Sequence, residues 1–214
     1  MTETDTTPKE KIEQFTEFES KYRVEGDKIY QFKEIVESMG EQSDFIYIQG
    51  PDYYFVRDDE RFARYRKADN DKSGRAEVTF KLKPVGAKSN IQRKEYNWRV
   101  DKTPYQEIAE GLEDQGYKFN FKITKFCHIY KFKEVTLVFY SVRDEKGKLD
   151  HFVEIELDEA TIHHLTVDEA MEKIRKYEAI LAPIGISHRG RLTKSLFEMY
   201  VKATKNEATS NKAT

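Results

Sequence analysis

The chain has 214 residues, of which 38% are apolar, 13% are aromatic and 36% are Asp, Glu, Lys or Arg, and its formal net charge is −2. A disordered chain of such polarity carries few aromatic residues and a large net charge, so this composition predicts a folded protein. The single cysteine, Cys127, excludes an intrachain disulfide, and without an 18-residue apolar run or a basic-then-apolar N-terminus we expect neither a membrane span nor export.

Both ends of the chain are polar and lack periodicity. We therefore expect disordered tails over residues 1–12 and 203–214. Between them the sequence contains no Pro/Gly/Ser-rich linker, repeat or low-complexity tract, which predicts one domain over residues 13–202.

The first predicted element is a strand over residues 17–24. Its charged residues are Glu17, Glu19, Lys21 and Arg23, and they alternate with Phe18, Ser20, Tyr22 and Val24. Because side chains of a strand alternate between its two faces, one face is wholly charged. Strands over 76–83, 93–100 and 153–157 repeat this alternation.

Four helices are predicted, and terminal signals bound three of them. Asp27 precedes a helix that ends at Gly40, Thr103-Pro104 precedes one that ends at Gly116, and Thr166 precedes one that Pro183 and Gly185 end. The fourth is predicted over residues 191–202.

Two interpretations of the charged strand faces remain open. In one, the strands are half-exposed and their charges face solvent. In the other, the apolar faces carry the helices, and the sheet closes with its charges pointing into a polar, water-filled tunnel. The two signs mix on one face at more positions than solubility requires, which favours the tunnel.

A tunnel lined by both signs of charge suits a polyphosphate with its divalent metal. Lys and Arg bind phosphate oxygens, and carboxylates bind Mg²⁺ or Mn²⁺. A Glu-x-Glu pair on a strand places two carboxylates on one side roughly 7 Å apart. Two such pairs occur, Glu17/Glu19 and Glu154/Glu156.

The order of several short motifs resembles the CYTH family, the class IV adenylyl cyclase and thiamine triphosphatase group of the triphosphate tunnel metalloenzyme superfamily. The first motif is E-x-E-x-K, from Glu17 to Lys21. The others, in chain order, are residues 49–55, 64–66 (R-x-R), 78–81, 93–95 (R-x-E), Lys125, 152–156 and 194–198. The resemblance extends over about residues 15–200.

The resemblance implies an α+β fold: a closed antiparallel eight-stranded β-barrel with a polar interior and helices packed outside. It implies that phosphate is bound by Lys21, Arg64, Arg66, Lys81, Arg93 and Lys125, and that metal is held by Glu17, Glu19, Glu154 and Glu156. The implied catalytic set is Glu17, Glu19, Lys21, Arg64, Arg66, Lys81 and Arg93. Lys83 lies on the same strand face, where a substrate contact and a tunnel-shaping ion pair both remain open.

Two positions depart from the family pattern. Residues 136–142 contain no carboxylate, where family members often have an Asp, and Phe126, Cys127 and His128 stand where an Arg commonly follows the lysine. Alternation also places Lys125 on the apolar face of its strand, with Phe121 and Ile123; a bulge near Thr124 would turn it inward. The sequence around Cys127 shows no feature that would lower the pKa of its thiol. We therefore expect a small packed side chain rather than a nucleophile.

The expected function is therefore hydrolysis of a triphosphate with Mg²⁺ or Mn²⁺, the substrate being inorganic tripolyphosphate, thiamine triphosphate or a nucleoside triphosphate. A class IV-type adenylyl cyclase and a non-catalytic triphosphate or nucleotide binder remain alternatives. We expect a cytoplasmic protein whose partner is a small triphosphate, with neither a membrane nor a nucleic-acid partner. The oligomeric state stays open.

Overall fold

The computed structural model describes residues 12–40, 44–58, 61–72, 74–81, 92–157 and 165–202, with the side chains of all of these except 12–17, 81 and 92–94. The strands are β1 (Ile12–Val24), β2 (Asp44–Val56), β3 (Phe62–Lys67), β4 (Ala76–Lys81), β5 (Gln92–Arg99), β6 (Lys118–Lys131), β7 (Val135–Arg143) and β8 (Leu149–Leu157). The helices are α1 (Lys28–Ser38), α2 (Tyr105–Asp114), α4 (Val167–Ile180) and α5 (Leu196–Tyr200), with 3₁₀ turns η1 (Ala182–Ile184) and η2 (His188–Gly190).

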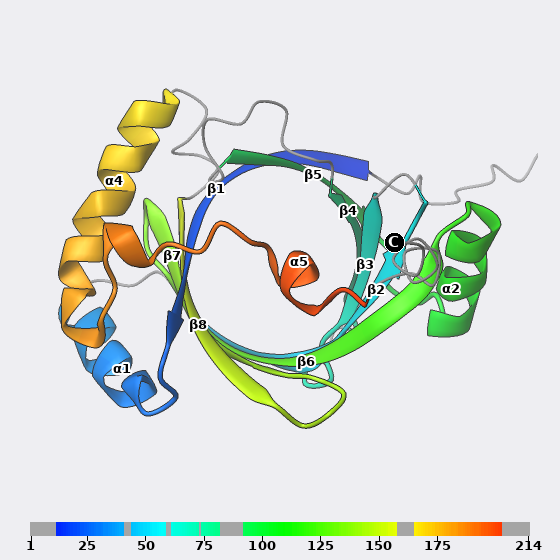
Figure 1. The fold of residues 1–214 in the computed structure, drawn as a ribbon, viewed down its shortest axis with the longest axis horizontal. Helices are drawn as coiled ribbons and strands as arrows, with labels where there is room; N and C mark the ends of the chain where they lie inside the picture. Colours follow the sequence, from blue (N-terminus) through cyan, green and yellow to red (C-terminus); the bar gives the residue numbers. More distant parts are fainter. Residues whose placement is uncertain are drawn as a thin grey trace, which may run out of the picture.

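All neighbouring strands are antiparallel, and their order, β1-β5-β4-β3-β2-β6-β7-β8, returns to β1 as a ring of pairings. Figure 1 looks into this ring, with α4 and α1 outside it at one side and α2 outside it at the other. The predicted eight-stranded antiparallel sheet with helices is confirmed.

The two halves of β1 serve different neighbours. Ile12–Phe18 pairs with β5, and Glu19–Val24 pairs with β8. The segment that leads to α5 runs along the second half, where the Leu192 amide donates to the Lys21 carbonyl oxygen at 2.8 Å and Arg191 bridges to Tyr22. Residues 191–192 therefore lie beside the part of β1 that does not pair with β5.

Three predicted helices are present at the expected places. α4 begins with a capping box, in which Thr166 accepts from the Glu169 amide and Glu169 accepts from the Thr166 amide. Asp27 precedes α1 as predicted, although its side chain makes no cap hydrogen bond. The fourth helix is shorter than predicted, because residues 191–192 extend along β1 and only Leu196–Tyr200 is helical.

Apolar residues on the outer strand faces pack against the helices in two clusters. α1 and α4 cover one cluster, which includes Tyr22, Phe139 and Ile155. α2 covers the other, which includes Tyr65 and Val78. Since these residues alternate with the charged ones along the strands, the charged residues of β1, β3, β4 and β8 lie on the face away from these helices.

A third apolar cluster lies inside the ring against α5. Its buried members are Tyr54, Phe121, Ile123, Cys127, Val138, Tyr140, Val142, Phe152 and Leu196. The irregularity in β6 falls between the Phe55–Phe119 and Tyr54–Phe121 pairs, not near Thr124. The predicted bulge site is therefore wrong, because the face shared by Phe121, Ile123 and Lys125 is itself the inner one.

Among the described segments, no helix combines the length and apolarity needed to cross a bilayer. The predicted tails at 1–11 and 203–214 lie outside the described residues, whereas Ile12 already belongs to β1.

Candidate functional site

A cavity of about 210 Å³ lies inside the ring next to α5. Its charged lining comes from Glu19, Lys21, Arg64, Arg66, Glu77, Glu95, Lys125, Glu154 and Glu156, and its remaining lining from Tyr54, Phe62, Asn97, Ser195, Leu196 and Phe197. Residues from strands far apart in the sequence, together with the start of α5, thus share one small space.

The cavity brings together seven residues that the sequence predicted: Glu19, Lys21, Arg64, Arg66, Lys125, Glu154 and Glu156. The side chains of Glu17, Lys81 and Arg93, and all of Lys83, lie outside what the structure describes, so their roles stay predictions. The backbone places Glu17 opposite Arg93 between β1 and β5.

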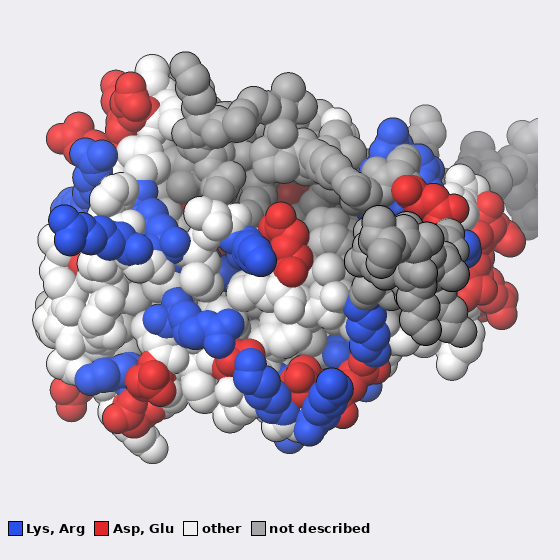
Figure 2. All heavy atoms as spheres, viewed as in Figure 1, with Lys and Arg blue, Asp and Glu red and all other residues white. Residues whose placement is uncertain are grey.

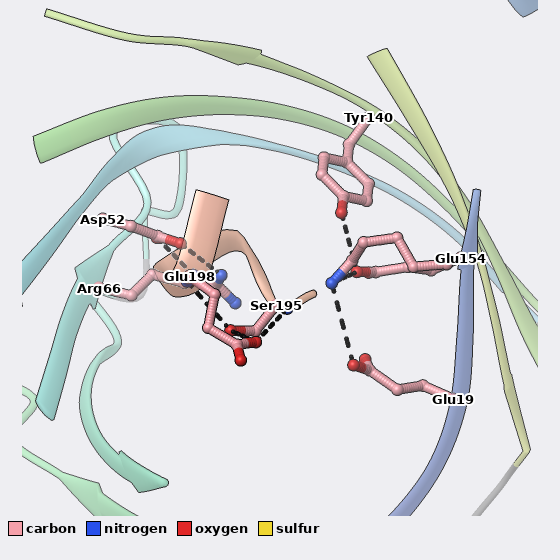
Figure 3. Close-up of polar contacts among 8 residues, drawn as sticks. Glu19, Asp52, Arg66, Tyr140, Glu154, Ser195 and Glu198 are labelled. Atoms are coloured by element: carbon pink, nitrogen blue, oxygen red, sulfur yellow. Dashed lines mark hydrogen bonds and ion pairs between the residues drawn. The ribbon is translucent and has the colours of Figure 1, made fainter. Parts of the chain in front are cut away.

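Glu154 is the centre of the acidic side of the cavity. The Lys21 ammonium lies 3.0 Å from Glu154 Oε1 and 3.9 Å from Glu19 Oε1. The Tyr140 hydroxyl donates to Glu154 Oε1 at 2.8 Å (Figure 3). Burial alone would raise the pKa of Glu154, but the charges of Lys21 and Lys125 and the hydrogen bonds from Lys21 and Tyr140 hold it well below its usual range.

On another side of the cavity, the lining residue Arg66 is paired with the buried Asp52. Arg66 Nε and Nη2 donate to the two carboxylate oxygens of Asp52, both at 2.7 Å (Figure 3). Burial would raise the pKa of Asp52, yet Arg66, with the charges of Arg64 and Lys125, lowers it to about 2. Asp52 is only 1% exposed, so it remains an ionised, buried anchor for Arg66.

The neighbouring Arg64 is also oriented by its surroundings. Its Nη2 donates to the Thr79 hydroxyl at 3.0 Å and lies 3.4 Å from Glu77 Oε1. Both partners stand on β4, directly across from β3. The two arginines of the R-x-R motif are therefore held by separate partners within one wall of the cavity.

Lys125 reaches the cavity from β6. Its ammonium lies 4.1 Å from the ring centroid of Tyr140, a cation–π distance. Gly50 is its direct partner on β2. A Cβ at Gly50 would lie 2.5 Å from the Lys67 carbonyl oxygen, so only glycine lets the end of β3 cross this close to β2.

α5 contributes an aromatic wall. The Phe197 ring stacks on Phe62 with centroids 4.2 Å apart, and it also contacts Tyr54 and Phe121. A capping box between Ser195 and Glu198 starts the helix, and Figure 1 shows α5 within the ring of strands. The sequence resemblance named this segment but did not predict its aromatic contacts.

Several lining residues were not among the predicted site residues. Strand alternation already pointed Glu77 and Glu95 inward, without assigning them a role. Asp52 and Tyr140 are not lining residues themselves, but they contact the lining residues Arg66 and Glu154 from neighbouring strands. Pairing between strands is a tertiary property that a single sequence does not give.

The carboxylates fit a divalent metal by donor type, because Mg²⁺ and Mn²⁺ prefer carboxylate oxygens. Glu19 and Glu156 are direct partners across β1 and β8, which places their Cβ atoms about 5 Å apart. Among the side chains that the structure describes, no three His, Cys, Asp or Glu residues lie close enough to hold one ion together. The Lys21 ammonium instead lies between Glu19 and Glu154, where a cation would be needed.

Cys127 is buried on the inner face of β6, and burial raises the pKa of its thiol. This agrees with the predicted packing role. The departures from the family pattern are visible too: the inward residues of β7 are Thr136, Val138, Tyr140 and Val142, none of them a carboxylate.

Comparison with solved structures shows the same fold at low sequence identity. A conserved hypothetical protein from Pyrococcus furiosus is 22% identical over 85% of this chain and 98% of its own, with a TM-score of 0.63. A candidate adenylate cyclase from Vibrio parahaemolyticus is 18% identical over 86% of this chain and 97% of its own, with a TM-score of 0.59. The Mimivirus capping enzyme triphosphatase is 10% identical over 78% of this chain and 90% of its own, with a TM-score of 0.52.

No family model and no curated protein matches the sequence. The similarity therefore lies in the arrangement of the strands and helices rather than in the sequence. The chain therefore shares the fold of these solved structures.

Proposed function

We propose that the chain hydrolyses a compact triphosphate inside the cavity, with Mg²⁺ or Mn²⁺. The observation that carries this proposal is the cavity lining, in which Lys21, Arg64, Arg66 and Lys125 share one space with Glu19, Glu154 and Glu156. The ring of strands is, in this proposal, the wall of a triphosphate-binding tunnel. The names of two structural neighbours, a triphosphatase and a candidate adenylate cyclase, support chemistry on triphosphates in general.

Each group has a distinct proposed role. Arg64, Arg66 and Lys125 bind phosphate oxygens and stabilise the charge that develops on them during in-line attack by water. One or two of the carboxylates Glu19, Glu154 and Glu156 would bind the metal ion, and phosphate oxygens of the substrate would supply further ligands. When bound, such an ion would supply Lewis-acid activation of a phosphoryl oxygen or of the attacking water.

The substrates are best separated in one assay. The protein is incubated with tripolyphosphate, thiamine triphosphate or ATP, each with Mg²⁺ or Mn²⁺, and the products are resolved. Release of orthophosphate supports the hydrolase, whereas pyrophosphate with cyclic AMP supports a class IV-type cyclase. Tight binding of a triphosphate without turnover supports a non-catalytic binder, an alternative that the absence of a carboxylate among the inward residues of β7 favours.

Glu156→Gln tests the acidic side of the site. The amide keeps the size of the side chain but removes the charge, so metal-dependent turnover should fall at least about 100-fold with little change in melting temperature. The control is Glu134→Gln, because Glu134 pairs with Lys173 away from the cavity. Unchanged turnover in Glu156→Gln would sink the metal assignment.

A further inference from the structure

Tyr140 lies between two charged strands that both contribute to the cavity. β7 pairs with β6 on one side and with β8 on the other, and the inward residues of β6 and β8 include Lys125 and Glu154. Tyr140 contacts both of them, Glu154 through its hydroxyl at 2.8 Å and Lys125 through its ring at 4.1 Å. It is fully buried, which fixes both of its ends.

The contact with Glu154 leaves the carboxylate able to bind a metal ion. The Tyr140 hydroxyl and the Lys21 ammonium both contact Oε1 of Glu154. Glu154 would be one of the residues that bind a metal ion, with its carboxylate oriented by Tyr140 and Lys21.

The contact between Tyr140 and Lys125 positions the phosphate-binding ammonium. A lysine side chain has several rotatable bonds and binds phosphate as a point charge. The aromatic face of Tyr140 gives this ammonium one preferred position in the cavity.

We propose that Tyr140 is a positioning residue that orients a metal-binding carboxylate, Glu154, and a phosphate-binding ammonium, Lys125, from the strand where the family pattern would have an acidic residue. The inference rests on the proposed function, because it requires Glu154 to bind metal and Lys125 to bind phosphate. In this chain, β7 then contributes no metal ligand; instead, its neutral side chain Tyr140 contacts Glu154 and Lys125.

Two substitutions separate the two contacts. Tyr140→Phe removes the hydroxyl and keeps the ring, so the Kd for Mn²⁺, measured by calorimetry without triphosphate, should rise about 10-fold. Its Kd for tripolyphosphate in metal-free buffer should stay within twofold of wild type. Tyr140→Leu removes both contacts, so both constants should rise, the tripolyphosphate Kd about fivefold.

The control is Tyr22→Phe. Tyr22 is also buried and donates its hydroxyl to a carboxylate, Glu178, at 2.7 Å, but this pair lies among the residues outside the ring. Loss of the Tyr22 hydroxyl should lower the melting temperature about as much as Tyr140→Phe does. It should leave the Kd for Mn²⁺ and the Kd for tripolyphosphate unchanged. The control thus measures the cost of losing a buried phenol–carboxylate hydrogen bond alone.

Two outcomes overturn the inference, and they are distinguishable. If wild type binds Mn²⁺ but Tyr140→Phe binds it as tightly as Tyr22→Phe does, Tyr140 does not position Glu154 and the proposed function survives. If wild type binds no Mn²⁺ at millimolar concentration, the metal part of the proposed function fails and this inference fails with it. A higher Mn²⁺ Kd only in the Tyr140 variants supports it.

Discussion

The pair formed by Asp52 and Arg66 shows how a buried carboxylate can hold a candidate phosphate-binding group in place. Both guanidinium contacts are 2.7 Å long, and the carboxylate is almost completely buried. Removing one partner of such a pair leaves the other charge poorly compensated, which is more costly than losing one neutral hydrogen bond. Asp52 therefore contributes to the stability of the folded protein as well as to the position of Arg66 in the site.

Asp52→Asn should lower the free energy of unfolding by about 2 kcal/mol at pH 7. The pKa of Asp52 is about 2 in the fold, below its value of about 3.8 in an unfolded chain, so its stabilisation is present above pH 4 and lost as the pH falls through 2. The difference between wild type and variant should shrink by about half at pH 3. Urea denaturation at both pH values measures this, with Asp58→Asn, at an exposed position, as the control. A difference that stays constant with pH contradicts the assignment.

At the scale of elements, α5 is held by aromatic contacts more than by its own length. It has five residues, too few for a helix to be stable by itself. Phe197 provides contacts to Phe62, Tyr54 and Phe121, and Tyr200 donates to Asp150 at 2.7 Å at the other end of the helix. The aromatic wall of the cavity thus depends on one side chain of a short helix.

Phe197→Ala should release α5 before the rest of the protein unfolds. Loss of the stacked ring should reduce stability by about 2 to 3 kcal/mol, since Phe197 is only partly buried. Hydrogen exchange of the amides of residues 196–201 should become faster while that of α4 stays unchanged. The control Tyr30→Ala removes an aromatic ring that is 74% exposed, and it should leave hydrogen exchange unchanged in residues 196–201 and in α4. Equal acceleration in α4 would show that α5 and α4 unfold together.

The strand faces could be predicted because alternation has a strict period of two and the helices need apolar surface to cover. The cavity lining at Glu19, Lys21 and Glu154 follows from that argument, whereas Arg64 was implied by the family resemblance. The position of Lys125 did not follow from alternation. It depends on the irregular pairing near Phe121 and on the apolar cluster that packs against α5 inside the ring. A bulge depends on the partner strand, and the partner is known only from the fold.

The shortness of α5 and the role of Tyr140 could not be predicted for related reasons. The sequence before α5 is compatible with a helix, but backbone pairing of Arg191 and Leu192 with β1 keeps it extended. In the sequence, the segment around Tyr140 stood out only because it contains no carboxylate. Its contacts run to two neighbouring strands, and strand order is a property of the whole ring.

On the scale of the whole molecule, the near balance of 37 basic and 39 acidic residues has two different origins. On the face drawn in Figure 2, which is seen from the same side as the ring in Figure 1, Lys and Arg are interspersed with Asp and Glu. Inside, the described charged lining has four basic and five acidic side chains, which pair with one another through contacts such as Lys21 with Glu154. The described charged lining is therefore nearly neutral.

The divided pairing of β1 has a consequence for how the protein behaves in solution. Residues 191–192 lie along the half of β1 that does not pair with β5, so a chain shortened to end before Arg191 would expose backbone groups of this half. An uncovered strand edge is a template for another copy of the chain. Such a shortened chain should self-associate in proportion to its concentration, which sedimentation velocity would detect, whereas the full chain at the same concentrations sets the reference. Three residues of the cavity lining, Ser195, Leu196 and Phe197, thus belong to the same short C-terminal segment that covers this edge of β1.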